Sequence, residues 1–161
     1  MCVHTTVYPR YAELHCVSNF SFLRGASHPE ELVEQAHHLG YDALAITDEC
    51  SLAGVVRAHG AAKKVGLHLI IGTEIQLVDG PTVILLAPNA HGYSEISQLI
   101  TLGRRRCEKG IYRLNRVDLE ATLNHALVLM VPGTPSTDQA AARWVARRFA
   151  GRAWIALEQF Y

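Results

Sequence analysis

The stretch YDALAITDECSL, residues 41–52, decides how the rest of the chain folds. Within it, Ala43–Ile46 is an unbroken apolar run, which is typical of a strand covered on both faces in a parallel sheet. Asp48 and Glu49 follow where this strand should end, and parallel sheets place their chemistry at that end. Two adjacent acids repel each other unless a cation, a proton or exposure to water relieves them. The sequence therefore predicts a functional or electrostatically compensated site at Asp48 and Glu49.

The residues around this strand predict alternating strands and helices. Apolar and polar residues alternate over 11–18, which indicates a first strand. Ser27 and Glu30 have the S-x-x-E spacing of a helix start, and an apolar stripe follows them. A second helix is predicted over 52–65 and another strand over 68–74. This alternation favours right-handed crossovers and parallel pairing.

The second half of the chain predicts a hairpin and then further helices and strands. Asp79-Gly80 is typical of a tight turn between strands at 75–78 and 82–87. The pattern that follows predicts, in order, a helix over 93–106, a short helix over 117–123, a strand over 126–131, a helix over 138–149 and a strand over 153–157. No repeat or linker divides the chain, so one α/β domain is expected over residues 1–161. A closed barrel needs more strands, so we expect the front part of a larger domain or protein.

Composition excludes several function classes. The 15 basic and 15 acidic residues give no net charge, so no whole-protein field draws the chain to nucleic acid or anionic lipid. No apolar run is long enough to span a membrane and no signal peptide is visible, so we expect a cytoplasmic protein without a membrane partner. The four cysteines are far apart, which favours reduced thiols over a zinc knuckle or a disulfide scaffold.

Four stretches together resemble one known family: AELHCVSNFSFLRGAS (12–27), ALAITDECSLAGVVRA (43–58), LIIGTEI (69–75) and VILLAPNAHGYSEISQLIT (83–101). They are similar to the N-terminal PHP (polymerase and histidinol phosphatase) domain of bacterial C-family DNA polymerases, and most similar to its error-prone branch. The resemblance implies a distorted (βα)7 TIM-like barrel, here incomplete at the C-terminus. Active members of the family hold metal ions at the C-terminal ends of the strands for phosphoester hydrolysis.

The resemblance also implies a set of metal ligands, which this chain keeps only in part. His15 and Glu74 stand at positions of a ligating histidine and carboxylate, and Asp48 keeps the acid of a TDH motif whose histidine is replaced by Glu49. Other ligand positions hold Val17, Arg24, Thr82 and a residue near Gly133, and a final Asp-x-His pair would lie beyond Tyr161. We therefore expect a degenerate site without a cofactor, or at most Zn²⁺ or Mn²⁺ at a vestigial site, with Mg²⁺ serving the parent polymerase.

Arg24 is the most informative departure from the family pattern. A guanidinium is always charged and forks onto carboxylates. We hypothesise that Arg24 neutralises Glu49 and Glu74 and replaces the missing cations with a structural ion pair. A separation above about 6 Å from both carboxylates would refute this. The expected role is then scaffolding or interaction within an error-prone, DNA-damage-associated polymerase. The expected partners are the remaining domains of that polymerase, DNA bound by the parent protein, and other repair factors.

Several alternatives stay open at this point. One is an active metal-dependent phosphoesterase or 3′–5′ exonuclease that uses His15, Asp48, Glu49 and Glu74, and another is a stand-alone binding module. His15 can also be a hydrogen-bonded core residue and Asp48 a helix cap. The basic run Arg104, Arg105 and Arg106 is either a solvated face or a contact to DNA or a neighbouring polymerase domain. An unclosed barrel also predicts self-association of the chain.

Overall fold

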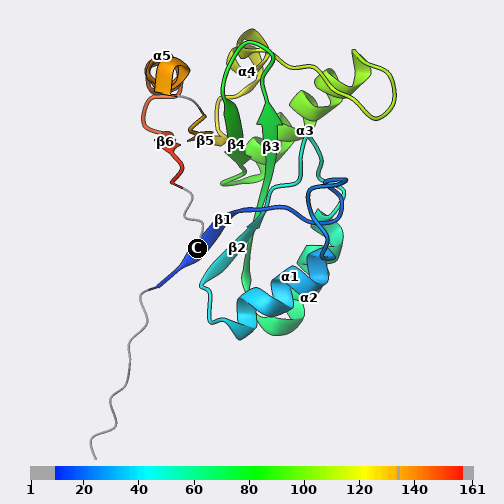
Figure 1. Ribbon diagram of the computed structural model, residues 1–161. Helices are drawn as coiled ribbons and strands as arrows, with labels where there is room; N and C mark the ends of the chain where they lie inside the picture. The colour runs from blue at the N-terminus through cyan, green and yellow to red at the C-terminus, as the bar shows by residue number, and fades with distance from the viewer. Residues whose placement is uncertain (1–9, 134, 158–161) are drawn as a thin grey trace, which may run out of the picture.

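A single curled sheet runs through the residues that the computed structural model describes, 10–133 and 135–157 (Figure 1). Its six strands follow chain order across the sheet: β1 (Ala12–Cys16), β2 (Ala43–Ile46), β3 (His68–Gln76), β4 (Thr82–Leu86), β5 (Leu127–Val131) and β6 (Ala153–Ile155). The helices are α1 (Pro29–His38), α2 (Val55–Val65), α3 (Ala90–Arg105), α4 (Arg116–Thr122) and α5 (Pro135–Arg148). In Figure 1, α1 and α2 cover the β1–β3 half, and α3, α4 and α5 lie around the β4–β6 half.

Strand β2 is buried on both faces, as its apolar run predicts. Leu44 and Ile46 pack with Val33 of α1 and Ala58 of α2, on one face of the sheet. Ala45 points to the opposite face and packs in a separate cluster with residues of β4 and β5. Side chains along a strand alternate between faces, so one short apolar run fills two cores. The predicted parallel pairing of β1, β2 and β3 is confirmed.

Helix α1 is confirmed, but its start differs by one residue from the predicted cap. His28 is the N-cap residue, and its backbone N–H donates to Glu31 Oε2 at 2.7 Å. Proline is favoured at the first helical position because its missing N–H has no partner there, and Pro29 occupies that position. Glu30, predicted as the capping acid, instead accepts a hydrogen bond from Arg57 of α2 at 2.5 Å. This pair joins the two helices.

The hairpin predicted at Asp79-Gly80 is confirmed, and it reverses the direction of one strand. β4 is antiparallel to both β3 and β5, and β5 is parallel to β6. The sequence pattern predicts two strands, over 68–74 and 75–78, but β3 is one continuous strand from His68 to Gln76. Because β4 runs backwards, Thr82 pairs with Gln76, and the start of β4 lies at the C-terminal end of β3.

The sheet encloses part of a barrel interior. Residues of both edge strands, β1 and β6, line one open and mostly apolar cavity of about 1280 Å³. Among the described residues, no further strand bridges β1 and β6. The α/β class and the incomplete TIM-like barrel predicted from the sequence are therefore confirmed. None of the helices in the described ranges is long and apolar enough to cross a bilayer.

Candidate functional site

The predicted site residues meet at the C-terminal ends of the first three strands. Glu49 follows β2 and forms an isolated parallel bridge with Glu74 of β3, reinforced by a 2.8 Å hydrogen bond from the Cys50 N–H to the Glu74 carbonyl. His15 is in β1 and lines the barrel cavity. Arg24 comes from the loop between β1 and α1. Four segments that are distant in sequence thus contribute to one place.

Arg24 lies against both predicted carboxylates. Its Nη1 is 2.5 Å from Glu74 Oε1 and its Nη2 is 3.0 Å from Glu74 Oε2, so the pair is bidentate. The same Nη1 is 3.1 Å from Glu49 Oε2. The Glu74 side chain is only 2% exposed, whereas that of Arg24 is 37% exposed. The guanidinium therefore closes the site from its solvent side and holds two acids that would otherwise repel each other.

His15 gives Glu74 a second donor. His15 Nε2 is 2.7 Å from Glu74 Oε2. Burial alone would raise the pKa of Glu74, but the hydrogen bonds from His15 and Arg24 and their charges lower it to about 2. Glu74 in turn raises the pKa of Arg24 above its ordinary value. An ionised carboxylate only accepts hydrogen bonds, so the Nε2 of His15 carries the proton in this contact.

The carboxylate of Asp48 accepts hydrogen bonds from the loop between β1 and α1. It is 2% exposed. Its Oδ1 accepts from the Ser18 N–H at 2.8 Å and from Ser21 Oγ at 2.7 Å, and its Oδ2 accepts from Ser18 Oγ at 2.7 Å. The interpretation of Asp48 as a cap of the next helix is wrong, because Gly54 is the N-cap of α2 and no side chain caps it. Nothing in the sequence marks the two serines as partners of Asp48, because about 30 positions separate them from it.

Glu49 has a third partner that sequence reasoning missed. The Tyr112 hydroxyl donates to Glu49 Oε1 at 3.0 Å and accepts from the Gln76 N–H at 2.9 Å. Burial is the main cause that raises the pKa of Tyr112, and Glu49 adds to it, so this hydroxyl keeps its proton. No local signal marks Tyr112, because 63 positions separate it from Glu49. Both carboxylate oxygens of Glu49 are thus engaged.

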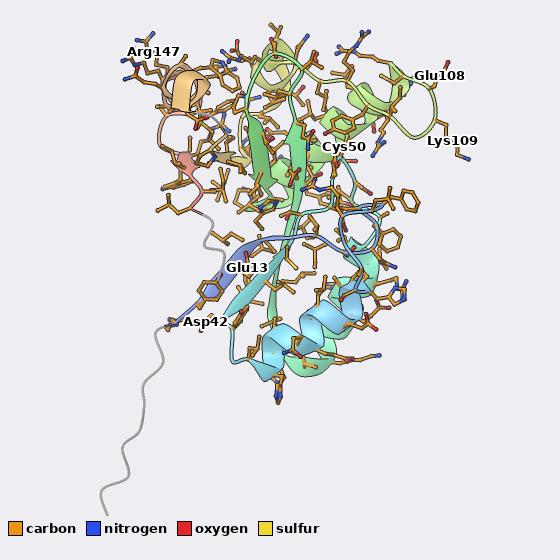
Figure 2. The ribbon with its side chains drawn as sticks, viewed as in Figure 1. Glu13, Asp42, Cys50, Glu108, Lys109 and Arg147 are labelled. Carbon is orange, nitrogen blue, oxygen red and sulfur yellow. The ribbon has the colours of Figure 1, made fainter. Side chains whose placement is uncertain are left out.

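The basic run at the end of α3 divides between protein contacts and solvent. Arg104 Nη2 donates to the carbonyls of Cys50 at 3.1 Å and Glu49 at 3.3 Å, so this side chain supports the site. Figure 2 labels Cys50, whose φ of 44° is uncommon for a residue with a side chain. Arg106 Nη1 pairs with Asp118 Oδ2 at 2.7 Å. Only Arg105 of the three is exposed without an ion pair among the described residues.

The residues present do not fit the metal cluster that the resemblance implies. Among the described residues, no group of three or more His, Cys, Asp or Glu side chains is arranged to hold a metal ion. Both oxygens of Glu74 accept from Arg24, and one also contacts His15. All three hydrogen bonds to Asp48 come from the loop that carries Arg24. Three protein donors thus engage each of these two carboxylates, which leaves about one of the roughly four lone-pair sites of each for a cation.

The chain is similar to a known domain family and to one segment of several longer proteins. The family described as PHP domain matches residues 13–149. The error-prone DNA polymerase of Dechloromonas aromatica is 60% identical over 155 residues, covering 93% of this chain and 15% of that protein. The error-prone DNA polymerase of Methylococcus capsulatus is 56% identical over 151 residues, covering 93% and 14%. The chain thus spans about 15% of the length of these curated relatives.

Solved structures share the fold at low sequence identity. A structure described as a metal-dependent phosphoesterase from Bifidobacterium adolescentis has a TM-score of 0.52 at 18% identity, covering 87% of this chain and 84% of that one. An amidohydrolase from Chromobacterium violaceum, solved with bound sulfate and no metal, has a TM-score of 0.57 at 14% identity, covering 89% and 75%. The family match, the relatives and the shared fold agree, and the chain belongs to the PHP domain family.

Proposed function

We propose that this chain is the PHP domain of an error-prone C-family DNA polymerase and that it acts as a scaffold or interaction domain, not as a hydrolase. The similarity to error-prone polymerases supports the first part. The observation that carries the second part is the bidentate contact of Arg24 with Glu74, extended to Glu49. In this proposal, the fixed positive charge of Arg24 takes the place of the cations that the family resemblance implies.

Electrostatics supports this role for Arg24. A divalent ion bound by Glu74 and Glu49 would lie within a few ångströms of the guanidinium, and like charges at that separation repel strongly in a partly buried site. The ion could bind only if Arg24 swung away from both carboxylates. That movement would break three charge-assisted hydrogen bonds at once. The ion pair therefore competes directly with any metal.

Polymerase activity belongs, in this proposal, to other parts of a longer protein. The resemblance implies nucleotidyl transfer at Mg²⁺-binding aspartates of a separate domain, with DNA held by the parent enzyme. Translesion synthesis after DNA damage, repair factors as partners and a cytoplasmic location are proposed on the same basis. By itself this chain should neither polymerise nor proofread.

A metal-dependent phosphoesterase or 3′–5′ exonuclease is the second candidate. It is favoured by the closeness of His15, Glu74 and Glu49, because imidazole and carboxylate groups are residue types that bind zinc. Three hydrogen bonds from the loop after β1 occupy both oxygens of Asp48, which this candidate would also use. Metal binding separates the two candidates.

The deciding experiment measures metal content and nuclease activity of the purified chain after incubation with Zn²⁺ or Mn²⁺ and gel filtration. We expect less than stoichiometric metal and no release of nucleotides from a 3′ end. A matched variant, Val17→His/Arg24→Glu/Glu49→His, restores the residue types that the family places at these positions, and it should gain metal by elemental analysis. Two or more ions in the unmodified chain, with nuclease activity lost in His15→Ala, would overturn the proposal.

We also propose that the isolated chain self-associates through its unclosed barrel. The edge strands β1 and β6 both border the apolar cavity, and exposed edges with apolar surface favour association. Analytical ultracentrifugation over a hundredfold range of concentration should show a rising average mass. A constant monomer mass over that range would refute self-association.

A further inference from the structure

The loop between β1 and α1 presents two large apolar side chains to solvent. Phe22 is 85% exposed and Leu23 is 90% exposed. Phe20, in the same loop, packs near Gly54 at the start of α2, and Val56 in the first turn of that helix is 81% exposed. Phe22 and Leu23 are adjacent in the chain, and neighbouring exposed apolar side chains mark sites of interaction more often than single ones. We call Phe22 and Leu23 the loop tip.

The loop tip is held in place from both sides. Before it, Ser21 Oγ donates to buried Asp48, and after it, Arg24 is bidentate on buried Glu74. The N–H groups of Arg24 and Gly25 both donate to the Ser21 carbonyl at 3.0 Å, which closes a tight turn around the tip. The site at the strand ends therefore fixes the backbone on which Phe22 and Leu23 stand.

The conformation of Leu23 supports a role outside the isolated fold. Its φ of 62° lies in the left-handed region, which residues with side chains seldom adopt. The turn brings Arg24 to Glu74, but the exposure of two large apolar side chains gives the chain alone no benefit. A preorganised apolar knob does benefit binding, because little conformational freedom remains to be lost on docking.

Charge near the loop tip favours a protein partner over nucleic acid. Residues 17–57 contain two arginines and no lysine, against six carboxylates. Both arginines pair with carboxylates of this segment or of Glu74. A surface that binds phosphates needs an excess of free cations. An aromatic and an aliphatic anchor in a segment without an unpaired arginine or lysine match an apolar pocket on a protein.

We propose that the loop tip docks into an apolar pocket on the remaining part of the polymerase polypeptide, so that Phe22 and Leu23 anchor this domain to its neighbour. This inference rests on the proposed membership of an error-prone polymerase. The occupant follows from length: the chain spans about 15% of its relatives, so most of the polypeptide that could cover the tip lies outside it. The Arg24 site would then position a docking loop instead of a metal-bound water.

The experiment compares thiol labelling of Phe22→Cys in two contexts. One is the 161-residue chain, and the other is a polymerase in which this chain replaces the matching segment of the Dechloromonas aromatica relative. Labelling by a maleimide is followed on the peptide that contains position 22 by mass spectrometry. We expect labelling to slow at least tenfold in the polymerase. The matched control is Leu39→Cys, because Leu39 is 55% exposed at the far end of α1 and should label at similar rates in both contexts.

Three outcomes would overturn the inference. Equal labelling at position 22 in both contexts would show that nothing covers the tip, and equal slowing at positions 22 and 39 would show general shielding. Protection that develops only when primed DNA is added would identify DNA as the occupant. Metal content is not measured in this experiment, so a metal-loaded, hydrolytic domain would refute the proposed function without deciding whether the tip docks.

Discussion

Glu74→Gln is the most direct test of the ion-pair site. The substitution keeps the shape of the side chain and removes the charge that Arg24 and His15 contact. A glutamine oxygen can accept from one of these donors, but its NH₂ group then faces another donor. We expect the variant to fold and to be clearly less stable than the parent chain.

The magnitude follows from the pKa of Glu74. Folding lowers this pKa from 4.5 to about 2, mainly through the contacts with His15 and Arg24 that outweigh burial. A difference of roughly 2.5 units corresponds to about 3 kcal/mol of preference for the charged form in the folded state. Because the Arg24 side chain is 37% exposed, solvent screens part of this, and we expect a loss of about 2–3 kcal/mol. A domain of this size has about 5–15 kcal/mol of stability, so the variant stays folded.

Urea unfolding at several pH values measures this loss and gives its sign. A carboxyl whose pKa is lowered by folding contributes its full stabilisation above the unfolded pKa and loses it as pH falls toward the folded pKa. The contribution of Glu74 should therefore be complete above about pH 4.5 and disappear toward pH 2. The difference in unfolding free energy between parent and Glu74→Gln should be constant near neutral pH and shrink over this window.

A matched control and a clear failure complete the test. Glu34→Gln removes a charge from the exposed face of α1 and should change stability by less than about 0.5 kcal/mol. A double-mutant cycle of Glu74→Gln with Arg24→Met should show coupling, because both substitutions remove the same contact. A loss below about 1 kcal/mol at pH 7, or a difference that does not change between pH 5 and pH 2, would refute the ion-pair reasoning.

Three further predictions concern the surroundings of the site. Gly25→Ala should cost more than about 2 kcal/mol of stability, because its Cβ would lie 2.1 Å from the Ser18 carbonyl oxygen. The control Gly60→Ala lies in an open part of α2 and should stabilise the chain by about 0.5–1 kcal/mol. Equal changes of melting temperature in the two variants would refute this prediction. Arg104→Ala should lower the free energy of unfolding in urea by about 2 kcal/mol, because it removes the donors to the Cys50 carbonyl. The control Arg105→Ala should change it by less than about 0.5 kcal/mol. Similar losses in the two variants would show that the contacts of Arg104 do not stabilise the fold. Burial raises the pKa of the Cys50 thiol to about 11, so labelling of Cys50 by a maleimide at pH 8 should require opening of the fold. Labelling of Cys50 at the rate of an exposed thiol would refute this.

Local patterns predicted the elements of this fold well, and the discrepancies have physical causes. The apolar run of β2 and the Asp79-Gly80 turn each specify their structure within a few residues. The sequence pattern places the cap of α1 one residue early. Ser27 and Glu30 have the spacing of a capping pair, but in the structure His28 and Glu31 form the cap. The proline at position 29 decides between them, since it fits the first helical position.

Distance in sequence explains which parts of the site were predicted. Arg24, Glu49 and Glu74 could be compared through the family resemblance, which supplies the long-range correspondence that spacing lacks. Tyr112 and Arg104 reach the site from the segment after β4, and no motif links them to β2. Their roles depend on how α3 and the following loop pack against the strand ends. Figure 2 shows Glu108 and Lys109 where that loop projects away from the body of the chain.

The acidic side chains at the strand ends are compensated in two different ways. Asp48 is satisfied by hydroxyl and N–H donors, which stabilise a carboxylate without adding a positive charge. Glu74 takes the guanidinium of Arg24, and Glu49 shares it while Tyr112 supplies a neutral donor. Each acid is thus compensated by side chains of this chain alone. Because Asp48 binds Ser18 and Ser21 and Glu74 binds Arg24, the compensation also holds the loop between β1 and α1 at both ends. Under the proposed function, Arg24 therefore has two effects: it competes with a metal ion at Glu74, and it fixes the loop that carries Phe22 and Leu23.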